Sequence, residues 1–314
     1  MPSGDPRSLR IAFVAQREYF ASSTLEDPAG GLEPRFFDFR FDAPVEPLLA
    51  ALADWAPDVV FVFRPEMVPA GAFAELDAVT VGYFTEPLHV PGHPPHPDLD
   101  TRFEVLQRVD AANFDRLCIY NPSFVATAER AVPIWRAFPI PISDRYYAPV
   151  RPIGAEGPRL LFVGRSTDHR ETFLGPLKRD FPLVHLAHGV TDEQYRMFVA
   201  QSEIGLNIHN EPYPNYEYRV SEFLAAGLLV ITEPLSPYHG LRPGTELLEV
   251  REPWEAWELV RAMQRAPEAF RPVALSGRRA AERFRASVVF PQLFADVLAD
   301  VEARGGRPSA VGAG

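Results

Sequence analysis

The chain has 314 residues, of which 46% are hydrophobic, 12% aromatic and 23% charged, and this globular composition leaves room for two domains. Its 31 basic and 42 acidic side chains give a formal net charge of −11, which repels phosphate backbones and anionic lipid. We therefore expect no nucleic-acid partner. The single cysteine, Cys118, cannot form an internal disulfide. No stretch approaches the roughly 18 apolar residues of a membrane span, and no signal-like run follows the polar N-terminus, so we expect a cytoplasmic protein without integral membrane contact.

In the first half, short apolar runs alternate with amphipathic stretches of helix length, a pattern typical of βαβ units and a parallel sheet. The run Val59–Phe63 is uninterrupted, as expected for a strand that is covered on both faces. Helices are predicted at Glu46–Trp55 and Phe103–Ala111. The predicted strands are Leu9–Ala15, Arg35–Phe39, Asp58–Phe63, Val79–Phe84, Arg116–Tyr120 and Val132–Phe138.

The same alternation begins again in the second half, after prolines and glycines between Ser143 and Gly157 that mark a domain boundary. Strands are predicted at Arg159–Val163, Leu183–Ala187, Ile204–Ile208, Leu228–Thr232 and Leu247–Val250. Helices are predicted at His169–Arg179, Asp192–Ala200, Glu217–Ala226, Trp254–Ala266, Glu268–Arg285 and Val288–Ala303. The fold class is therefore α/β, with two Rossmann-like doubly wound lobes facing a cleft. We expect lobes at residues 1–150 and 151–286, a last helix at 287–304 and a disordered tail at 305–314.

Ligands of open α/β sheets bind outside the carboxyl ends of the strands, so the residues that follow each predicted strand are candidates for a site. In the second half these residues are Gly164, Arg165, His188, Gly189, Asn207–Asn215 and Glu233. In the first half they are Gln16, Arg17, Arg64, Glu86–His89 and Asn121.

The segment Gly164-Arg165-Ser166 lies between a predicted strand and a helix that begins near His169. Glycine lets a ligand approach the backbone, the N-terminus of a helix favours an anion, and Arg165 can pair with a phosphate. The alternative is a glycine at a strand–helix turn beside a solvated arginine. The segment alone leaves both interpretations open.

The loop Asn207–Asn215 is polar, aromatic and stiffened by prolines, and Asn215 is a reasonable N-cap for a helix that begins at Tyr216. Within that helix Arg219 and Glu222 are three residues apart and share a face. A carboxylate there can accept hydrogen bonds from both ribose hydroxyls, and an arginine can neutralise a diphosphate. The alternative is a surface ion pair worth about 0.3–0.5 kcal/mol.

Three stretches resemble the C-terminal lobe of the CgeB-like glycosyltransferases, relatives of the retaining family 4 enzymes with the GT-B fold. They are Ser202–His209 (SEIGLNIH), Tyr218–Thr232 (YRVSEFLAAGLLVIT) and Pro243–Glu246 (PGTE). Their order and spacing agree with the family pattern S-x-I-x-L-N-I-H, R-x-F-E-x-x-A-x-G-x-x-L-L-T and P-G-x-E. The resemblance covers about 100 residues, from Phe162 through Val250. In the first half it is limited to the βα alternation and to Glu86-Pro87.

The resemblance implies a nucleotide-diphospho-sugar donor on the C-terminal lobe, an acceptor on the N-terminal lobe and a final helix that crosses back to the first lobe. UDP or TDP is the first guess for the nucleotide, and the acceptor is a small molecule or a glycan. No metal and no other cofactor is implied. The implied donor contacts are Glu222 at the ribose, and Arg219 and Arg165 near the diphosphate with Gly164 beside them. His188 and Gly189 are implied at the base. Donor-binding candidates on the strand-end pattern are Asn207, His209 and Asn215.

The resemblance therefore implies that the protein is a metal-independent hexosyltransferase. It also implies that the reaction retains the anomeric configuration, with the leaving phosphate deprotonating the acceptor. The catalytic candidates are Glu86, His89 and Arg165; if the enzyme inverts instead, Glu86 or His89 is the general base. Pro214 stands where many relatives have a second glutamate, and Ser221 replaces the phenylalanine before the motif glutamate. Two alternatives therefore remain open: a GT-B-type nucleotide-sugar epimerase, and a two-lobed binding protein without catalysis. The acidic motif Asp98-Leu99-Asp100 follows a proline-rich loop rather than a buried strand and does not predict a metal site.

Overall fold

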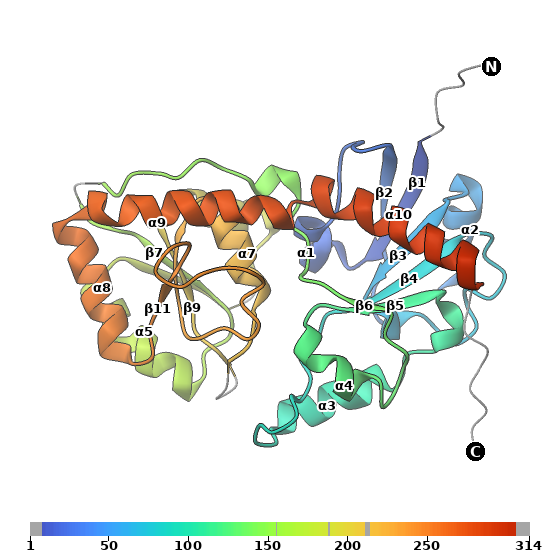
Figure 1. The fold of residues 1–314 in the computed structure, drawn as a ribbon, viewed down its shortest axis with the longest axis horizontal. Coiled ribbons are helices and arrows are strands. Elements are labelled where there is room, and N and C mark those ends of the chain that lie inside the picture. Colours follow the sequence, from blue (N-terminus) through green and yellow to red (C-terminus); the bar gives the residue numbers. More distant parts are fainter. Residues whose placement is uncertain (1–7, 155, 188, 211–213, 306–314) are drawn as a thin grey trace. The chain divides into compact units, whose positions relative to one another are not determined.

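The computed structural model describes residues 8–154, 156–187, 189–210 and 214–305. The chain divides into two compact units, one formed by residues up to Asp144 together with those from Arg285 onward, and the other by Arg145–Phe284. Each unit contains one parallel sheet with helices beside it (Figure 1). The predicted class of two Rossmann-like, doubly wound α/β domains is confirmed. Within the described ranges, no helix has the length and apolar character that a membrane crossing requires.

The sheet of the N-terminal unit has the strand order β2-β1-β3-β4-β5-β6, and all of its pairings are parallel. Its strands are β1 (Leu9–Ala15), β2 (Leu32–Asp38), β3 (Val59–Phe63), β4 (Val79–Phe84), β5 (Arg116–Ile119) and β6 (Arg136–Ala137). Strand β1 has the predicted bounds, whereas β2 begins three residues earlier than predicted, directly after the turn at Gly30 and Gly31. The predicted strand Val132–Phe138 is wrong in length, because only Arg136 and Ala137 pair with β5.

The helices of this unit are α1 (Arg17–Phe20), α2 (Glu46–Trp55), α3 (Pro97–Leu106), α4 (Val125–Ala128) and α10 (Ala286–Arg304). Helix α2 has the predicted bounds, but the helix predicted at Phe103–Ala111 begins instead at Pro97. Proline at the first helical position loses no hydrogen bond and has its φ preset for a helix, so α3 includes the acidic pair Asp98 and Asp100.

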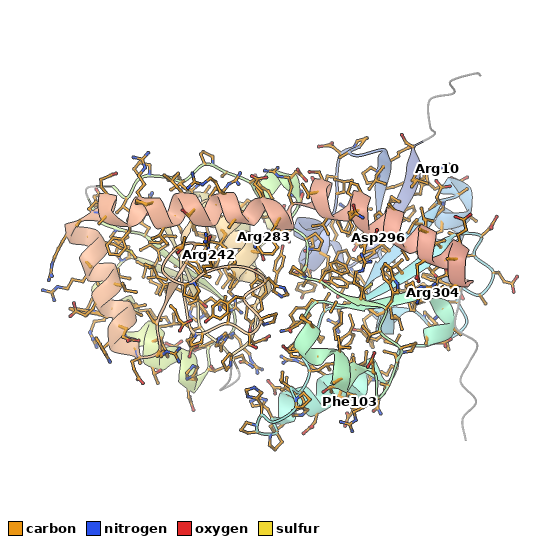
Figure 2. All side chains as sticks on the ribbon, in the orientation of Figure 1. Arg10, Phe103, Arg242, Arg283, Asp296 and Arg304 are labelled. Carbon is orange, nitrogen blue, oxygen red and sulfur yellow. The ribbon has the colours of Figure 1, made fainter. Side chains whose placement is uncertain are left out.

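Helix α10 packs on the sheet of the N-terminal unit through aromatic side chains. Phe290 and Phe294 are buried and lie against Phe13 of β1 and Phe61 of β3, with ring centroids 4.7–6.2 Å apart. At the edge of the sheet, Asp296 of the same helix (labelled in Figure 2) forms an ion pair with Arg136 at 2.6 Å. The C-terminal helix is thereby part of the N-terminal unit, as the division of the chain at Arg285 also indicates.

The sheet of the C-terminal unit has the order β11-β10-β9-β7-β8, again with parallel pairings. Its strands are β7 (Leu160–Val163), β8 (Leu183–Leu186), β9 (Ile204–Asn207), β10 (Leu229–Thr232) and β11 (Leu248–Glu249). Its helices are α5 (Asp168–Asp180), α6 (Asp192–Gln201), α7 (Tyr218–Ala225), α8 (Pro253–Arg265) and α9 (Pro267–Ala280). Helix α9 ends five residues earlier than predicted, because a 3-10 turn at Ala281–Phe284 follows it.

The strand order of the C-terminal unit places a topological switch point between β7 and β9. From β7 the chain moves to β8 on one side, and then returns to β9 on the other side. The connections that leave β7 and β9 therefore diverge at the carboxyl edge of the sheet, which is where open α/β sheets bind ligands. Gly164 follows β7, and Asn207 is the last residue of β9.

Candidate functional site

A buried arginine in the first turn of α5 joins the two connections at the switch point. Arg170 is 3% exposed. Its Nε donates to the carbonyl oxygen of Ile208 at 3.0 Å, and its Nη1 donates to the carbonyl oxygen of Arg165 at 2.9 Å. One guanidinium thus holds the segment after β7 and the segment after β9 in a fixed relation. Thr167 caps α5 through its hydroxyl, so the N-terminus of this helix also lies at this edge.

A second arginine, Arg219, reaches the same place from the first turn of α7. Its Nη1 donates to Oδ1 of Asn207 at 3.0 Å, and its Nη2 lies 3.3 Å from a carboxylate oxygen of Glu217. The Asn207 amide is fixed in turn by its Nδ2, which donates to the hydroxyl of Thr232 at 2.8 Å. The guanidinium carbons of Arg170 and Arg219 lie 5.3 and 5.5 Å from the ring centroid of Phe162, within reach of cation–π attraction.

The two guanidinium groups converge where Gly164 lacks a side chain. Gly164 has a φ of +146°, and a Cβ built on it would lie 3.2 Å from Nη1 of Arg170 and 3.4 Å from Nη2 of Arg219. Two like charges held this close favour a polyvalent anion beside them, and guanidinium groups bind phosphate oxygens in bidentate fashion. We name Gly164, Arg170, Asn207 and Arg219 the switch-point cluster.

Next to this cluster, α7 carries the buried carboxylate of Glu222, which is 3% exposed. The hydroxyl of Tyr195 donates to Oε2 and the hydroxyl of Tyr218 donates to Oε1, the latter at 3.3 Å. Burial raises the pKa of Glu222 to about 7, although both tyrosine hydrogen bonds and the charge of Arg219 favour the ionised form. Near neutral pH the carboxylate therefore exists in both protonation states.

The remaining candidates of this unit lie in different environments. Arg165 is exposed, and its Nε donates to Oδ1 of Asn210 at 3.2 Å. His209 is buried, with Nε2 2.7 Å from the carbonyl oxygen of Pro234 and its backbone N–H donating to Glu233 at 2.6 Å. Gly189 adopts a φ of +80° after β8. His188 lies outside the described residues.

The predicted capping role of Asn215 is wrong, because α7 begins two residues later than expected. The N-cap is Glu217, and the first helical residue is Tyr218. Asn215 is buried, and its Oδ1 accepts the backbone N–H of the adjacent Tyr216 at 2.8 Å. This local bond is made before the helix begins and does not cap it.

The candidates of the N-terminal unit are held in ion pairs at the carboxyl end of their own sheet. Glu86 lies between Arg64 and Arg102, with N–O distances of 3.0 and 3.4 Å. Nε2 of His89 lies 2.8 Å from Oδ1 of Asp100 in helix α3. A carboxylate accepts but does not donate, so this pair leaves Nδ1 of His89 as the basic nitrogen when the ring is neutral.

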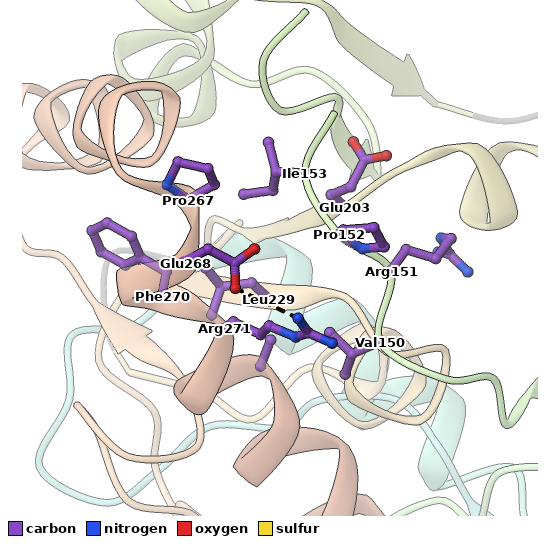
Figure 3. Close-up of a pocket in the computed structure, with 11 residues that line it drawn as sticks. Val150, Arg151, Pro152, Ile153, Glu203, Leu229, Pro267, Glu268, Phe270 and Arg271 are labelled. Carbon is purple, nitrogen blue, oxygen red and sulfur yellow. Dashed lines mark hydrogen bonds and ion pairs between the residues drawn. The ribbon is translucent and has the colours of Figure 1, made fainter. Parts of the chain in front are cut away.

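A small pocket in the C-terminal unit lies at the opposite edge of the sheet (Figure 3). Its lining includes Glu203, which precedes β9, and Leu229, the first residue of β10, so it is found at the amino ends of these strands. Glu268 and Arg271, three residues apart on α9, form an ion pair at 3.5 Å along the wall of the pocket. Among the residues that the structure describes, no group of three His, Cys, Asp or Glu side chains is arranged to hold a metal ion.

Three residues that complete the site were not selected from the sequence: Arg170, Tyr195 and Tyr218. The strand-end rule selects connections, whereas these side chains lie inside helices α5, α6 and α7. For Arg170 the sequence carried a usable signal, since an arginine in the first helical turn after a strand-end glycine lies near the sheet edge. For Tyr195, 27 residues from its partner Glu222, the sequence offered none.

Part of the chain is similar to a known protein family, and the whole chain is similar in fold to solved structures. Residues 155–292 match the family model described as glycosyl transferase-like. No curated protein sequence shows significant similarity to the chain. Among solved structures, a sucrose-phosphate synthase from Thermosynechococcus elongatus aligns with a TM-score of 0.61 at 14% identity, over 93% of this chain and 100% of the other.

Two further structures show the same architecture. HepE from Anabaena, solved with UDP and glucose, aligns with a TM-score of 0.59 at 11% identity, over 93% of this chain and all of HepE. A protein from Listeria monocytogenes described as a UDP-N-acetylglucosamine 2-epimerase aligns with a TM-score of 0.53 at 10% identity, over 97% and 100% of the two chains. At these identities the likeness shows the fold alone. The chain therefore has the GT-B fold, and residues 155–292 are its glycosyl transferase-like part.

Proposed function

We propose that the protein is a glycosyltransferase that moves a sugar from a nucleotide-diphospho-sugar to a small-molecule or glycan acceptor, with retention. The observation that carries the proposal is the convergence of Arg170 and Arg219 beside Gly164 at the switch point of the C-terminal sheet. The match of residues 155–292 to a glycosyl transferase-like family supports it. The cytoplasm is the compartment in which we expect the reaction.

The proposed role of the switch-point cluster is to bind the donor diphosphate. Charge develops on the leaving phosphate as the bond to the sugar breaks, and preorganised cations at that point stabilise the transition state. Arg170 and Arg219 supply two fixed guanidinium groups, and the N-terminus of α5 adds its dipole. Arg165, exposed at the rim, is proposed to contact the phosphate next to the sugar.

The rest of the nucleotide extends from this cluster towards Glu222, whose carboxylate is the proposed partner of the ribose hydroxyls. Gly189 and His188 are proposed to border the base, and Asn207, His209 and Asn215 support the loops around the phosphates. UDP is the first nucleotide to test, since the neighbour HepE was solved with UDP and glucose.

In the proposed reaction no enzymic nucleophile is required. The bond between the anomeric carbon and the phosphate oxygen breaks, the acceptor oxygen forms a new bond on the same face, and the leaving phosphate takes the acceptor proton. Glu86 and His89 are the proposed acceptor contacts. If the product is inverted instead, His89 is the better general base, because Asp100 fixes its tautomer. No metal or other cofactor enters the proposal.

Calorimetric titration with UDP, TDP, GDP, ADP and CMP tests the donor site, followed by incubation of the matching nucleotide-sugars without acceptor. We expect micromolar binding of one diphosphate and slow hydrolysis of its sugar. Arg219→Met should weaken binding about tenfold or more. Arg251→Met, whose side chain is 72% exposed, is the matched control and should bind as the wild type does. Absence of binding to every nucleotide would reject the proposal.

An epimerase is the second candidate, because the Listeria protein described as one has the same fold and acts on a nucleotide-sugar by its description. Such an enzyme turns over its nucleotide-sugar without a second substrate. Incubation of UDP-N-acetylglucosamine alone, followed by proton NMR, separates the two activities. A new epimeric nucleotide-sugar identifies an epimerase, whereas free sugar and UDP identify donor hydrolysis by a transferase.

A further inference from the structure

An arginine in an unusual backbone conformation follows strand β3 at the carboxyl edge of the N-terminal sheet. Arg64 has a φ of +64°, in the left-handed region that residues with a Cβ rarely adopt. Such a conformation is costly, and it persists where the surrounding structure requires it, often at functional sites. The guanidinium of Arg64 contacts two carboxylates: Glu66 in the 3-10 turn that follows directly, and Glu86 after the neighbouring strand β4.

The two glutamates that contact Arg64 differ in their access to water. The side chain of Glu66 is fully buried, and its Oε1 accepts a hydrogen bond from Nε of Arg64. Among the residues that the structure describes, Oε2 of Glu66 has no hydrogen-bond partner, so Arg64 is the counter-ion of this buried charge. The side chain of Glu86 is 27% exposed. Water can solvate the carboxylate of Glu86 but not that of Glu66, so Arg64 retains Glu66 and can exchange Glu86 for another anion.

A second arginine, Arg102 of helix α3, contacts the other oxygen of Glu86. Its Nε lies 3.4 Å from Oε2, and Nη1 of Arg64 lies 3.0 Å from Oε1. Both arginine side chains are partly exposed, at 26% for Arg64 and 24% for Arg102. The carboxylate of Glu86 thus lies between two guanidinium groups that reach solvent. A carboxylate or phosphate group of a ligand presents paired oxygens to arginines in the same way, so Glu86 marks the place where such an anion would bind.

We propose that Arg64 and Arg102 form a subsite for an oxyanion group of the acceptor, a carboxylate or a phosphate, and that Glu86 occupies this subsite as an exchangeable counter-ion in the free protein. That the ligand is the acceptor rests on the proposed function, whereas the subsite itself rests on the ion pairs of these side chains. Once Glu86 is displaced, the two arginines and the buried Glu66 carry one net positive charge, which the anionic group of the ligand neutralises. An acceptor with such a group can therefore bind although the chain has a net charge of −11.

Thermal unfolding of the full chain in saturating UDP tests the subsite, because UDP occupies the switch-point cluster and removes it as a binding site for small anions. Sodium phosphate or sodium acetate replaces sodium chloride at constant ionic strength. We expect at least one of these anions to raise the unfolding midpoint, by about 2 °C at about 20 mM. A rise with phosphate alone identifies a phosphate group on the ligand, and a rise with acetate alone identifies a carboxylate.

Arg102→Met should abolish this rise. Arg102 is the better residue to replace, because an Arg64 variant would leave the buried charge of Glu66 without its counter-ion and would destabilise the fold. The matched control is Arg304→Met in the same unit, since Arg304 is 77% exposed and pairs with Asp300 instead. It should show the same rise as the wild type. Any general stabilisation by phosphate affects both variants equally.

Replacement of Glu86 should have the opposite effect. Glu86→Gln removes the charge that competes with the ligand but keeps the size of the side chain. This variant should reach half of its maximal rise at an anion concentration about threefold lower than the wild type requires. If it requires as much anion as the wild type, or more, Glu86 is not an exchangeable counter-ion.

The remaining outcomes separate this inference from the proposed function. Equal rises in the wild type and in Arg102→Met, or no rise in either, overturn the anion subsite but leave the donor site standing. If UDP does not bind, the donor site fails by itself. The anion titration is then repeated without UDP in Arg219→Met, in which the switch-point cluster lacks one of its two arginines. A rise in that variant that Arg102→Met again abolishes supports the subsite, and its absence overturns it.

Discussion

The buried guanidinium of Arg170 donates to the backbone carbonyl of the exposed Arg165, 2.9 Å away. Arg165 was a site candidate from the sequence, whereas Arg170, which holds its backbone in place, was not. The same guanidinium donates to Ile208 after β9. A single side chain therefore fixes both segments of the proposed phosphate site.

Replacement of Arg170 by Met should cost stability as well as ligand affinity. The buried carbonyl of Ile208 and the partly buried carbonyl of Arg165 would each lose a charged donor, and the loss of a partner by a buried acceptor costs about 1–3 kcal/mol. We expect urea unfolding to show a loss of about 2–4 kcal/mol and calorimetry to show no measurable UDP binding. Arg179→Met, at the exposed end of the same helix, is the control and should change stability by less than about 0.5 kcal/mol. If the Arg170 variant is as stable as the wild type, Arg170 does not stabilise the segments after β7 and β9.

Gly164→Ala should disturb the cluster directly. The φ of +146° disfavours any L side chain, and the new Cβ would press on both guanidinium groups. We expect a loss of about 1–3 kcal/mol in the free energy of unfolding and weaker nucleotide binding.

Gly175→Ala is the matched control for this change. Gly175 lies inside α5, and apart from its neighbours along the helix no atom lies within 4 Å of its Cβ position, so alanine should leave nucleotide binding unchanged. Because Pro176 follows directly and disfavours the helical conformation of a residue with a Cβ, we expect no gain in stability. Similar effects of the two substitutions on UDP affinity would argue against a special role of Gly164.

The fold was largely predictable from the sequence because its strands are short apolar runs. Val59–Phe63 is fully buried, and the strand-end rule led to Gly164 and Asn207 from the pattern alone. Element ends were less predictable, since Pro97 begins α3 inside a segment that looked like a loop. The partners of the site residues could not be predicted. Tyr195 of α6 meets Glu222 of α7 only through the tertiary fold, which no local sequence pattern encodes.

The raised pKa of Glu222 should appear as a pH dependence of stability. A carboxyl whose pKa moves from 4.5 in the unfolded chain to about 7 in the folded protein contributes stability below pH 4.5. This contribution decreases as the pH rises and is lost above about 7. Glutamine has no such dependence. The stability of Glu222→Gln relative to the wild type should therefore rise between pH 4.5 and 7, by up to about 3 kcal/mol. Urea unfolding at several pH values measures this difference, and parallel curves for the two proteins would contradict it.

His239 should give the opposite dependence at lower pH. Burial lowers its pKa from 6.5 to about 4, and its ring meets Tyr216 edge to face at 4.5 Å. Its Nε2 has no hydrogen-bond partner among the residues that the structure describes. A histidine that stays neutral when folded but ionises when unfolded costs stability as the pH falls from 6.5 to 4. Asparagine tolerates the positive φ of 49° at this position and does not titrate.

His239→Asn should therefore gain about 2 kcal/mol relative to the wild type when the pH is lowered from 7 to 5, whatever the fixed cost of the lost ring contact. Unfolding free energies of both proteins at these two pH values give the difference directly, and the fixed cost cancels. If the difference in unfolding free energy between the two proteins is the same at pH 5 and pH 7, His239 does not titrate with a lowered pKa. The buried ring then makes a hydrogen bond in solution that stabilises its charged form.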